Sequence, residues 1–323
     1  MTEQMIKTQE TLAHSLVVAP PPPSGLEFTV GNTPLLVLRR VTAGLPHSVQ
    51  VFAKAEWFNP GGSIKDRPAF NILRTALASC ELIPGKRLLD STSGNMGIAY
   101  TTFGAAMDVP VSLVLPANAS PERIAILRAL GAELVLSDPL EGSDGAIRVA
   151  RQIAAERPDR YYYANQYDNP ANWQAHYYTT GPEIWQQTAG RVTHLVAGLG
   201  TSGTLTGAGR CLRETNPEIQ LVAVQPDGPL HGLEGLKHMP SAIRPGIFDP
   251  GLPDRILEIA SEEAYAMVRR LAREEGLFVG ISAGAAAVAA LKVARGLEQG
   301  VVVTVFPDAG YKYLSDRALW EAA

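Results

Sequence analysis

The chain has 323 residues, of which 46% are hydrophobic, so it is long enough for one large or two medium-sized domains with extensive cores. Its net charge is −4 and it has no basic run, which argues against nucleic acid as a main partner. No apolar run reaches the length of a membrane span. The two cysteines, Cys80 and Cys211, form no CxxC pair and the six histidines have no ligand spacing, so we expect a cytoplasmic protein without a metal site.

Residues 1–25 are interpreted as a flexible leader. Their apolar part, residues 16–19, is too short for the core of a signal peptide. The four prolines at positions 20–23 form a stiff, extended spacer, for which a plain linker is favoured over a site that docks a partner.

From Gly31 onward, short apolar segments typical of strands alternate with segments typical of helices. This alternation indicates parallel sheets covered by helices on both faces. There are too many strands for one comfortable sheet, so we expect two such units, with ligands beyond the carboxyl ends of the strands. The segment 229–260 is rich in proline and glycine and is expected to be irregular. Strands are expected at 35–38, 49–54, 87–90, 111–115, 133–136, 161–164, 193–197, 221–224 and 301–306, and helices at 69–77, 98–107, 120–131, 144–156, after the 198–204 loop as far as 214, at 262–275 and after 284.

A lysine lies in the loop between the second strand and the helix that follows it. This residue, Lys65, belongs to the segment Asn59–Pro68, which is rich in glycine and proline. A lone lysine in a loop is usually a solvated surface charge. Strand-to-helix junctions also tend to carry function, and several other loops supply groups that a lysine-bound aldehyde cofactor needs.

The segment Gly198–Thr204 follows a strand and opens a helix, which makes it a candidate phosphate site. Backbone N–H groups at the helix N-terminus and the hydroxyls of its threonines and serine would surround a single terminal phosphate. The segment also matches GxGxxG, but a nicotinamide site would need an acid near the end of the next strand, where the chain has Gln225. A purely structural glycine turn is the remaining alternative.

The segment Gly280–Gly284 matches GxSxG, the nucleophile elbow of the α/β-hydrolases. Those enzymes place their histidine after the serine, whereas the last histidine of this chain is His238. The hydrolase interpretation therefore fails. Ser282 is then either a hydroxyl that hydrogen-bonds a ring nitrogen or the N-cap of a helix.

The segment Thr92–Gly97 opens another helix. Its amides and hydroxyls suit a carboxylate at the positive end of that helix, and Asn95 suits a phenolic oxygen of a cofactor. An ordinary capped turn is the alternative.

Together these segments resemble the cysteine synthases (O-acetylserine sulfhydrylases) and cystathionine β-synthases, which are fold-type II pyridoxal-phosphate enzymes. The resemblance covers about residues 26–318 and leans towards the B-type cysteine synthases. It implies two three-layer α/β/α domains with mostly parallel sheets, like the tryptophan synthase β chain, with pyridoxal 5'-phosphate between them. The implied division is a smaller, movable domain at 59–169 that closes over the substrate, and a larger domain at 26–58 with 170–323 that anchors the cofactor. The segments that carry the resemblance are Asn59–Pro68, Thr92–Asn95, Asn165–Asn172, Gly200–Thr204 and Gly280–Gly284.

The resemblance also implies a role for each matching residue. Lys65 is implied to bind the cofactor aldehyde covalently and to act in catalysis. Substrate binding is implied for Thr92, Ser93 and Gln166, and for the position of Met96, where the family commonly has threonine. Lys237 would recognise a phosphorylated serine, as a cation does in some relatives, unless it is a solvated lysine. Further cofactor contacts are implied for Asn95 (ring oxygen), Gly200, Thr201, Ser202, Gly203 and Thr204 (phosphate), and Ser282 (pyridine nitrogen).

The activity that the resemblance implies is β-replacement on an activated L-serine to give L-cysteine. O-Acetylserine is the preferred substrate and O-phosphoserine the second choice, with sulfide or a sulfur-carrier protein as the sulfur donor. The alternatives are cystathionine synthesis from homocysteine, or β-elimination as in serine and threonine dehydratases. The resemblance further implies a homodimer.

Overall fold

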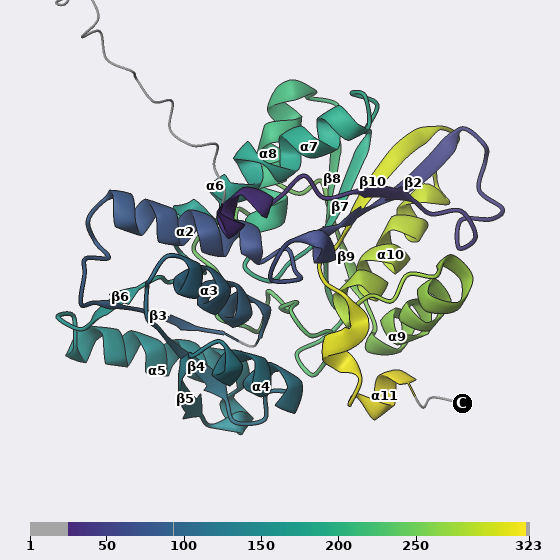
Figure 1. The fold of residues 1–323 in the computed structure, drawn as a ribbon. Coiled ribbons are helices and arrows are strands. Elements are labelled where there is room, and N and C mark those ends of the chain that lie inside the picture. The colour runs from purple at the N-terminus through teal and green to yellow at the C-terminus, as the bar shows by residue number, and fades with distance from the viewer. Residues whose placement is uncertain (1–24, 93, 321–323) are drawn as a thin grey trace, which may run out of the picture.

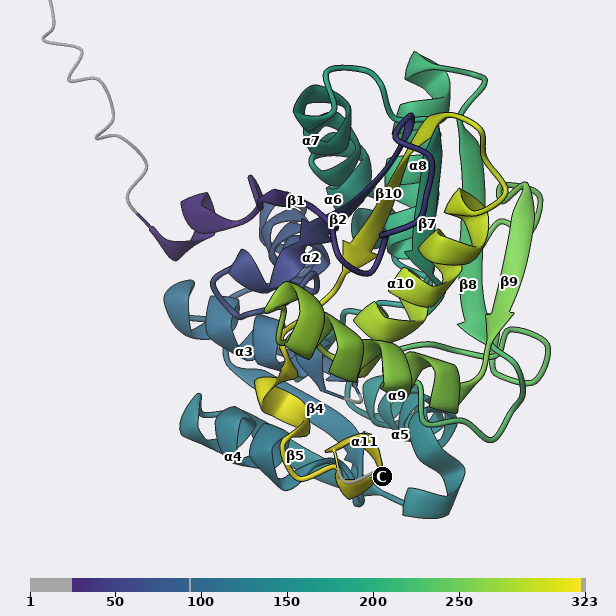
Figure 2. The ribbon, with the colours of Figure 1, turned by 90° about the vertical axis from the view of Figure 1, so that its right-hand side faces the viewer.

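A computed structural model describes residues 25–92 and 94–320 of the chain (Figures 1 and 2). The predicted leader lies outside these residues except for Gly25. No helix in the described part is long and apolar enough to cross a membrane.

Two sheets form the centre of the fold, one with six strands and one with four. Within these sheets all neighbouring strands run parallel except β1 and β2, which pair antiparallel. In spatial order the large sheet contains β1 (Leu35–Val37), β2 (Val49–Ala55), β10 (Gly300–Phe306), β7 (His194–Gly198), β8 (Gln220–Pro226) and β9 (Arg255–Ile259). The small sheet contains β5 (Glu133–Ser137), β4 (Val111–Pro116), β3 (Arg87–Ser91) and β6 (Tyr161–Tyr163).

Helices cover both faces of each sheet, so each sheet is the middle of three layers (Figures 1 and 2). The α-helices are α2 (Asp66–Ala78), α3 (Asn95–Ala106), α4 (Pro121–Ala129), α5 (Gly142–Glu156), α6 (Pro170–Tyr178), α7 (Thr180–Gln187), α8 (Gly203–Thr215), α9 (Ser261–Arg270), α10 (Ile281–Ala294) and α11 (Arg317–Trp320). Short 3₁₀ turns occur at η1 (Leu26–Thr29), η2 (Glu56–Phe58), η3 (Pro139–Glu141) and η5 (Gly310–Tyr313), and a π-type turn, η4, at Leu271–Glu275. This arrangement confirms the predicted class of two α/β units with mostly parallel sheets.

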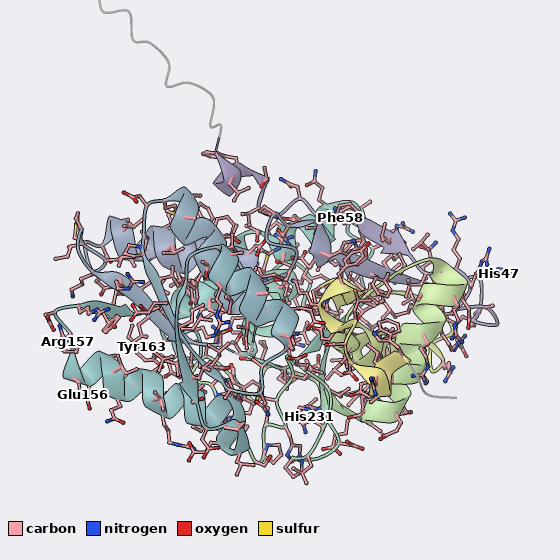
Figure 3. The ribbon with its side chains drawn as sticks, turned by 60° about the horizontal axis from the view of Figure 1, so that its bottom comes forward. His47, Phe58, Glu156, Arg157, Tyr163 and His231 are labelled. Atoms are coloured by element: carbon pink, nitrogen blue, oxygen red, sulfur yellow. The ribbon has the colours of Figure 1, made fainter. Side chains whose placement is uncertain are left out.

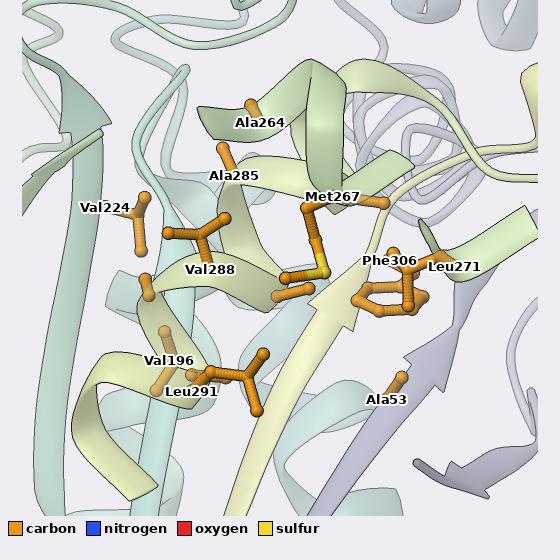
Figure 4. Packing of buried hydrophobic residues seen from close by; sticks show 14 of the residues in the cluster. Ala53, Val196, Val224, Ala264, Met267, Leu271, Ala285, Val288, Leu291 and Phe306 are labelled. Atoms are coloured by element: carbon orange, nitrogen blue, oxygen red, sulfur yellow. The ribbon is translucent and has the colours of Figure 1, made fainter. Parts of the chain in front are cut away.

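The central strands of the large sheet, β10, β7 and β8, are mostly apolar because they are buried on both faces. Along β7, Leu195 and Ala197 face the core beneath α7 and α8, whereas Val196 between them faces the core beneath α9 and α10. Successive side chains of a strand point to opposite faces, which explains this alternation. Figure 4 shows the second core, in which Val196 lies with Val288 and other side chains of α9 and α10.

The small sheet is built in the same way. Leu88 of β3 belongs to a core with Phe103 of α3, while its neighbour Leu89 belongs to a core with Ala146 and Ala150 of α5. Helix α4 begins as predicted, because Ser120 is its N-cap and accepts a hydrogen bond from the backbone of Arg123 at 3.3 Å.

Three local predictions were wrong or incomplete. The segment expected to be irregular contains β9, an edge strand that pairs with β8 and carries exposed polar residues such as Arg255. Two helices, α6 and α7, occupy a stretch for which no element was predicted. The predicted helix at 262–275 is regular only as far as Arg270 and then widens into a π-type turn that ends at Gly276, whose φ is 71°.

Candidate active site

A cavity lies between the two sheets, at loops that follow their strands. It is lined by the loop before α2, by residues of α3, α4, α5 and α10, by the loop before α8 and by the loop after β8. All the predicted site residues that the structure describes line it: Lys65, Thr92, Asn95, Met96, Gln166, Gly200, Thr201, Ser202, Gly203, Thr204, Lys237 and Ser282. The remaining predicted residue, Ser93, lies outside the described residues.

Lys65 is the residue just before α2, and its side chain is half-buried in the cavity. Its loop is tied to the segment after β10, because the N–H of Ile64 donates a hydrogen bond to the carbonyl oxygen of Pro307 at 2.8 Å. Burial lowers the pKa of the Lys65 amine, and the negative charge of Asp308 partly offsets this effect. A lowered pKa increases the neutral, nucleophilic fraction of the amine, so Lys65 is suited to react with an aldehyde.

The glycine loop, residues 198–204, forms a cup between β7 and the first turn of α8. Ser202 adopts a left-handed conformation, with a φ of 69°, and its buried hydroxyl oxygen has no hydrogen-bond partner among the described residues. A side chain at Gly200 would collide with the carbonyl oxygen of Gly235. The loop therefore presents backbone N–H groups at a helix N-terminus and an unsatisfied hydroxyl, which fit an anion such as a phosphate.

A buried histidine supports the glycine loop from behind. His176 of α6 lies 2.9 Å from the hydroxyl of Thr180 through Nδ1 and 3.4 Å from that of Thr204 through Nε2. Burial lowers the pKa of His176 to about 3, so the ring is neutral at physiological pH. The histidine therefore orients Thr204 without adding charge to the cup.

The loop before α3 provides the second helix N-terminus that faces the cavity. The hydroxyl oxygen of Thr92 accepts hydrogen bonds from the N–H groups of Gly94 (3.0 Å) and Gly97 (3.1 Å), which fixes the turn. Gln166 lies beside this loop and donates from Nε2 to the carbonyl oxygen of Ser91 at 2.6 Å. Met96 is buried in the core of the small sheet as well as at the cavity wall.

Asn95 is the first residue of α3, and both ends of its amide contact the chain after β10. Its Nδ2 donates to Oδ2 of Asp308 at 2.7 Å, and its Oδ1 accepts from Nζ of Lys312 at 2.9 Å. Asp308 is fully buried.

Ser282 lies in the first turn of α10 and is 6% exposed. The N-cap of this helix is Gly280, so the interpretation of Ser282 as an N-cap is wrong. The Ser282 hydroxyl therefore does not cap the helix, and Ser282 lines the cavity.

Lys237 lies on the loop after β8, the loop that also carries His231, labelled in Figure 3. It is only 6% exposed, so the interpretation as a solvated lysine is wrong. Its ammonium forms an ion pair with Asp144 of α5 at 2.7 Å and lies 5.0 Å from the ring centroid of Tyr167. The positive charge of Lys237 is thus already neutralised by a carboxylate from the small-sheet side of the cavity.

Among the lining residues that were not found from the sequence are Arg123, Glu234 and Tyr313. The buried guanidinium of Arg123 forms an ion pair with Glu234 and lies 5.1 Å from the ring centroid of Tyr313. Arg123 follows an ordinary helix start and Tyr313 is far away in the sequence. No local pattern pointed to either, because only the tertiary fold brings them to the cavity.

Comparison with known proteins identifies the family. The family model described as "Pyridoxal-phosphate dependent enzyme" matches residues 26–308, and the chain belongs to this family. A cysteine synthase of Aquifex aeolicus is 52% identical over 88% of this chain and 89% of its own, and cysteine synthase B of Escherichia coli is 42% identical over 92% and 97%. A crystal structure of a cysteine synthase from Entamoeba histolytica aligns with a TM-score of 0.88 and 35% identity over 94% of this chain and 93% of its own. An O-ureido-L-serine synthase aligns with a TM-score of 0.86 and 37% identity over 94% and 96%.

The cavity fits the cofactor of this family. The glycine loop has the N–H groups and the unsatisfied Ser202 hydroxyl that a phosphate would bind, and Lys65 lies in the same cavity with a lowered pKa. Asn95 and Ser282 add polar groups to the lining of the same cavity.

Proposed function

We propose that this protein makes L-cysteine by β-replacement on O-acetyl-L-serine, with pyridoxal 5'-phosphate as cofactor and sulfide as sulfur donor. The observation that carries the proposal is that Lys65 and the glycine loop line one cavity, together with the helix N-terminus at Thr92. The cysteine synthases among the relatives support the choice of reaction.

The residues of the chain have distinct roles in this proposal. When bound, the cofactor supplies an electron sink that acidifies the substrate Cα–H bond. Lys65 would hold the cofactor aldehyde at rest and would act as the base that takes up the Cα proton. Thr92 and Ser93, together with the neighbouring Gln166, bind the substrate carboxylate at the N-terminus of α3. Ser282 lines the cavity and would donate a hydrogen bond to the ring nitrogen, and a neutral donor there would favour loss of a good leaving group over transamination.

The charges at the cavity wall favour acetate over phosphate as the leaving group. Lys237 is paired with Asp144, and Arg123 is paired with Glu234. A phosphate dianion placed beside these cations would also lie beside their carboxylates, and like charges at close range repel. The neutral acetyl ester avoids this repulsion.

The proposal includes the surroundings in which the enzyme works. We propose a homodimer in the cytoplasm, where a reducing environment suits the two free cysteines, Cys80 and Cys211. A sulfur-carrier protein is the alternative source of sulfur. Size-exclusion chromatography with light scattering gives the oligomeric state directly.

The test compares substrates on the purified holoenzyme. Cysteine formation is measured with O-acetylserine, O-phosphoserine or serine, each with sulfide and, separately, with homocysteine as acceptor. We expect the highest kcat/KM for O-acetylserine with sulfide, and no turnover by a Lys65→Ala variant. Faster cystathionine formation, or release of an α-keto acid without sulfide as the main reaction, would overturn the proposal.

A further inference from the structure

The amide of Asn95 is held between two opposite charges from one short segment, residues 307–313. The carboxylate of Asp308 accepts from its Nδ2, and the ammonium of Lys312 donates to its Oδ1. A carboxylate only accepts hydrogen bonds and an ammonium only donates them. If the amide turned by 180°, oxygen would face oxygen and N–H groups would face the ammonium, so the two charges permit one orientation.

Both charged groups are themselves fixed. The hydroxyl of Tyr313 donates to Oδ2 of Asp308 at 2.9 Å, and the backbone N–H of Gly280 donates to the Asp308 carbonyl oxygen at 3.0 Å. Lys312 also donates to the carbonyl oxygen of Gly62 at 3.2 Å, in the loop that carries Lys65. The segment 307–313 therefore connects Asn95, the Lys65 loop and the start of α10.

The packing leaves little room for this arrangement to change. A side chain at Gly280 would collide with Oδ1 of Asp308 and press on the ring of Tyr313, so only glycine allows the carboxylate to lie there. Burial lowers the pKa of Lys312, while the charges of Asp308 and Asp66 oppose that change and help to keep the ammonium protonated.

We propose that Asp308 and Lys312 are positioning residues that fix the Asn95 amide with an N–H group directed to the cofactor. One N–H of Nδ2 binds Asp308, and the second is left for a negatively charged oxygen, such as the ring oxygen of pyridoxal phosphate. The inference rests on the proposed role of Asn95 in cofactor binding. Its chemical prediction is that Lys312, which does not line the cavity, contributes to cofactor affinity mainly through Asn95 rather than through its hydrogen bond to Gly62.

A double-mutant cycle tests this prediction. The dissociation constant of pyridoxal 5'-phosphate is measured by equilibrium dialysis for the full-length protein and for Lys312→Met, Asn95→Ala and the double variant. We expect Lys312→Met to weaken binding about tenfold in the wild-type background, and less than about twofold in the Asn95→Ala background, because residues that act through one another are not additive. Equal weakening in both backgrounds, or no weakening in either, overturns the inference.

A second variant and a matched control separate positioning from folding. Asp308→Asn keeps the size of the side chain, but an asparagine can both donate and accept, so it no longer fixes the orientation of the Asn95 amide. We therefore expect weaker cofactor binding and an unchanged thermal midpoint of the cofactor-free protein. Lys292→Met removes an exposed lysine that pairs with Glu263 at 3.0 Å, and cofactor affinity should not change. Loss of thermal stability by Asp308→Asn without a change in affinity would make Asp308 merely structural and overturn the inference.

The same cycle distinguishes the inference from the proposal on which it rests. If Asn95→Ala binds the cofactor as tightly as the wild type, the role of Asn95 is wrong and the inference falls with it. If Asn95→Ala weakens binding but the cycle is additive, only the inference is overturned. The synthesis of cysteine is measured separately and does not depend on either result.

Discussion

At the scale of single residues, two cations at the cavity wall are each neutralised before any substrate arrives. Lys237 pairs with Asp144, and Arg123 pairs with Glu234. The lysine is nearly fully buried, so its charge is screened less than a surface charge would be. The carboxylate that accompanies it therefore affects which substrate charge the cavity accepts.

The first prediction concerns this carboxylate. Asp144→Asn removes the negative charge beside Lys237 and leaves the ammonium available to an anionic leaving group. We expect kcat/KM for O-phosphoserine to rise about tenfold relative to that for O-acetylserine, as removal of about 1.4 kcal/mol of repulsion implies. The exposed Asp159→Asn variant is the control. An unchanged ratio of the two kcat/KM values would show that Asp144 does not affect selectivity.

A second residue-scale prediction concerns pH and Asp90, which is fully buried beneath the substrate loop. Burial raises the pKa of Asp90 to about 7, although Ser91, Tyr100 and Gln166 all donate hydrogen bonds to it. The folded state then binds more protons than the unfolded state between about pH 4 and about pH 7, and in that range this carboxyl makes the wild type less stable as pH rises.

Asp90→Asn cannot titrate, so its stability relative to the wild type should improve with pH. We expect the difference in the free energy of unfolding to change by a few kcal/mol in favour of the variant across this range. Urea denaturation of both proteins at several pH values measures it. A difference that stays constant with pH would mean that the carboxyl is not perturbed.

At the scale of elements, the start of α2 is anchored by a buried ionic network. Arg67, two residues after Lys65, pairs with Glu56 after β2 and with Glu183 of α7, both at 2.7 Å. Lys54 of β2 pairs with the same Glu183 at 2.6 Å. Two positive and two negative side chains therefore balance one another inside the protein, and their ion pairs hold the Lys65 loop in place.

The third prediction follows from this network. The pKa of Glu183 is lowered to about 2: burial raises it, but the Arg67 and Lys54 charges outweigh that effect. The side chain is therefore ionised at neutral pH, and its stabilising contribution is lost only as pH falls towards that value. Glu183→Gln leaves two buried cations undercompensated and should lower the free energy of unfolding by about 3 kcal/mol.

Urea denaturation at neutral pH measures this change against a surface control. Glu274 forms an exposed pair with Arg270 at 2.7 Å, and Glu274→Gln should change the free energy of unfolding far less than Glu183→Gln. Similar small losses for both variants would contradict a role for the network.

The elements also show how far sequence reasoning reaches. The loops around Lys65, Asn95 and Ser202 could be predicted because glycine, hydroxyl and helix-start signals are local. The strand β9 could not, because an edge strand with Arg255 and Glu258 facing outward lacks the apolar run on which the prediction relied. Arg123 could not be placed at the site either, since a charged residue within a helix carries no signal of what lies opposite.

At the scale of the whole molecule, hydrogen bonds connect the unit around the small sheet to a loop of the unit around the large sheet. Asp144 accepts from the N–H of Ile243 at 2.8 Å as well as from Lys237, and Asp168 accepts from the N–H of Gly246 at 2.8 Å. These contacts join the predicted movable part, residues 59–169, to the loop after β8. The boundaries of that part remain a prediction.

The fourth prediction is that substrate tightens this junction. On addition of O-acetylserine to the holoenzyme, amide hydrogen exchange should slow in both 142–145 and 237–246, because closure stabilises the hydrogen bonds that join them. Slower exchange on one side only, or none, would contradict closure of these two parts over the substrate.

The attachment of the cofactor to Lys65 is the central claim, and one measurement tests it most directly. The protein is saturated with pyridoxal 5'-phosphate, reduced with borohydride to make the bond permanent, and digested for peptide mapping by mass spectrometry. The account predicts the mass of the reduced cofactor on the peptide that contains Lys65. Label on Lys54, Lys237 or Lys312 instead, or no label on any peptide, would contradict it.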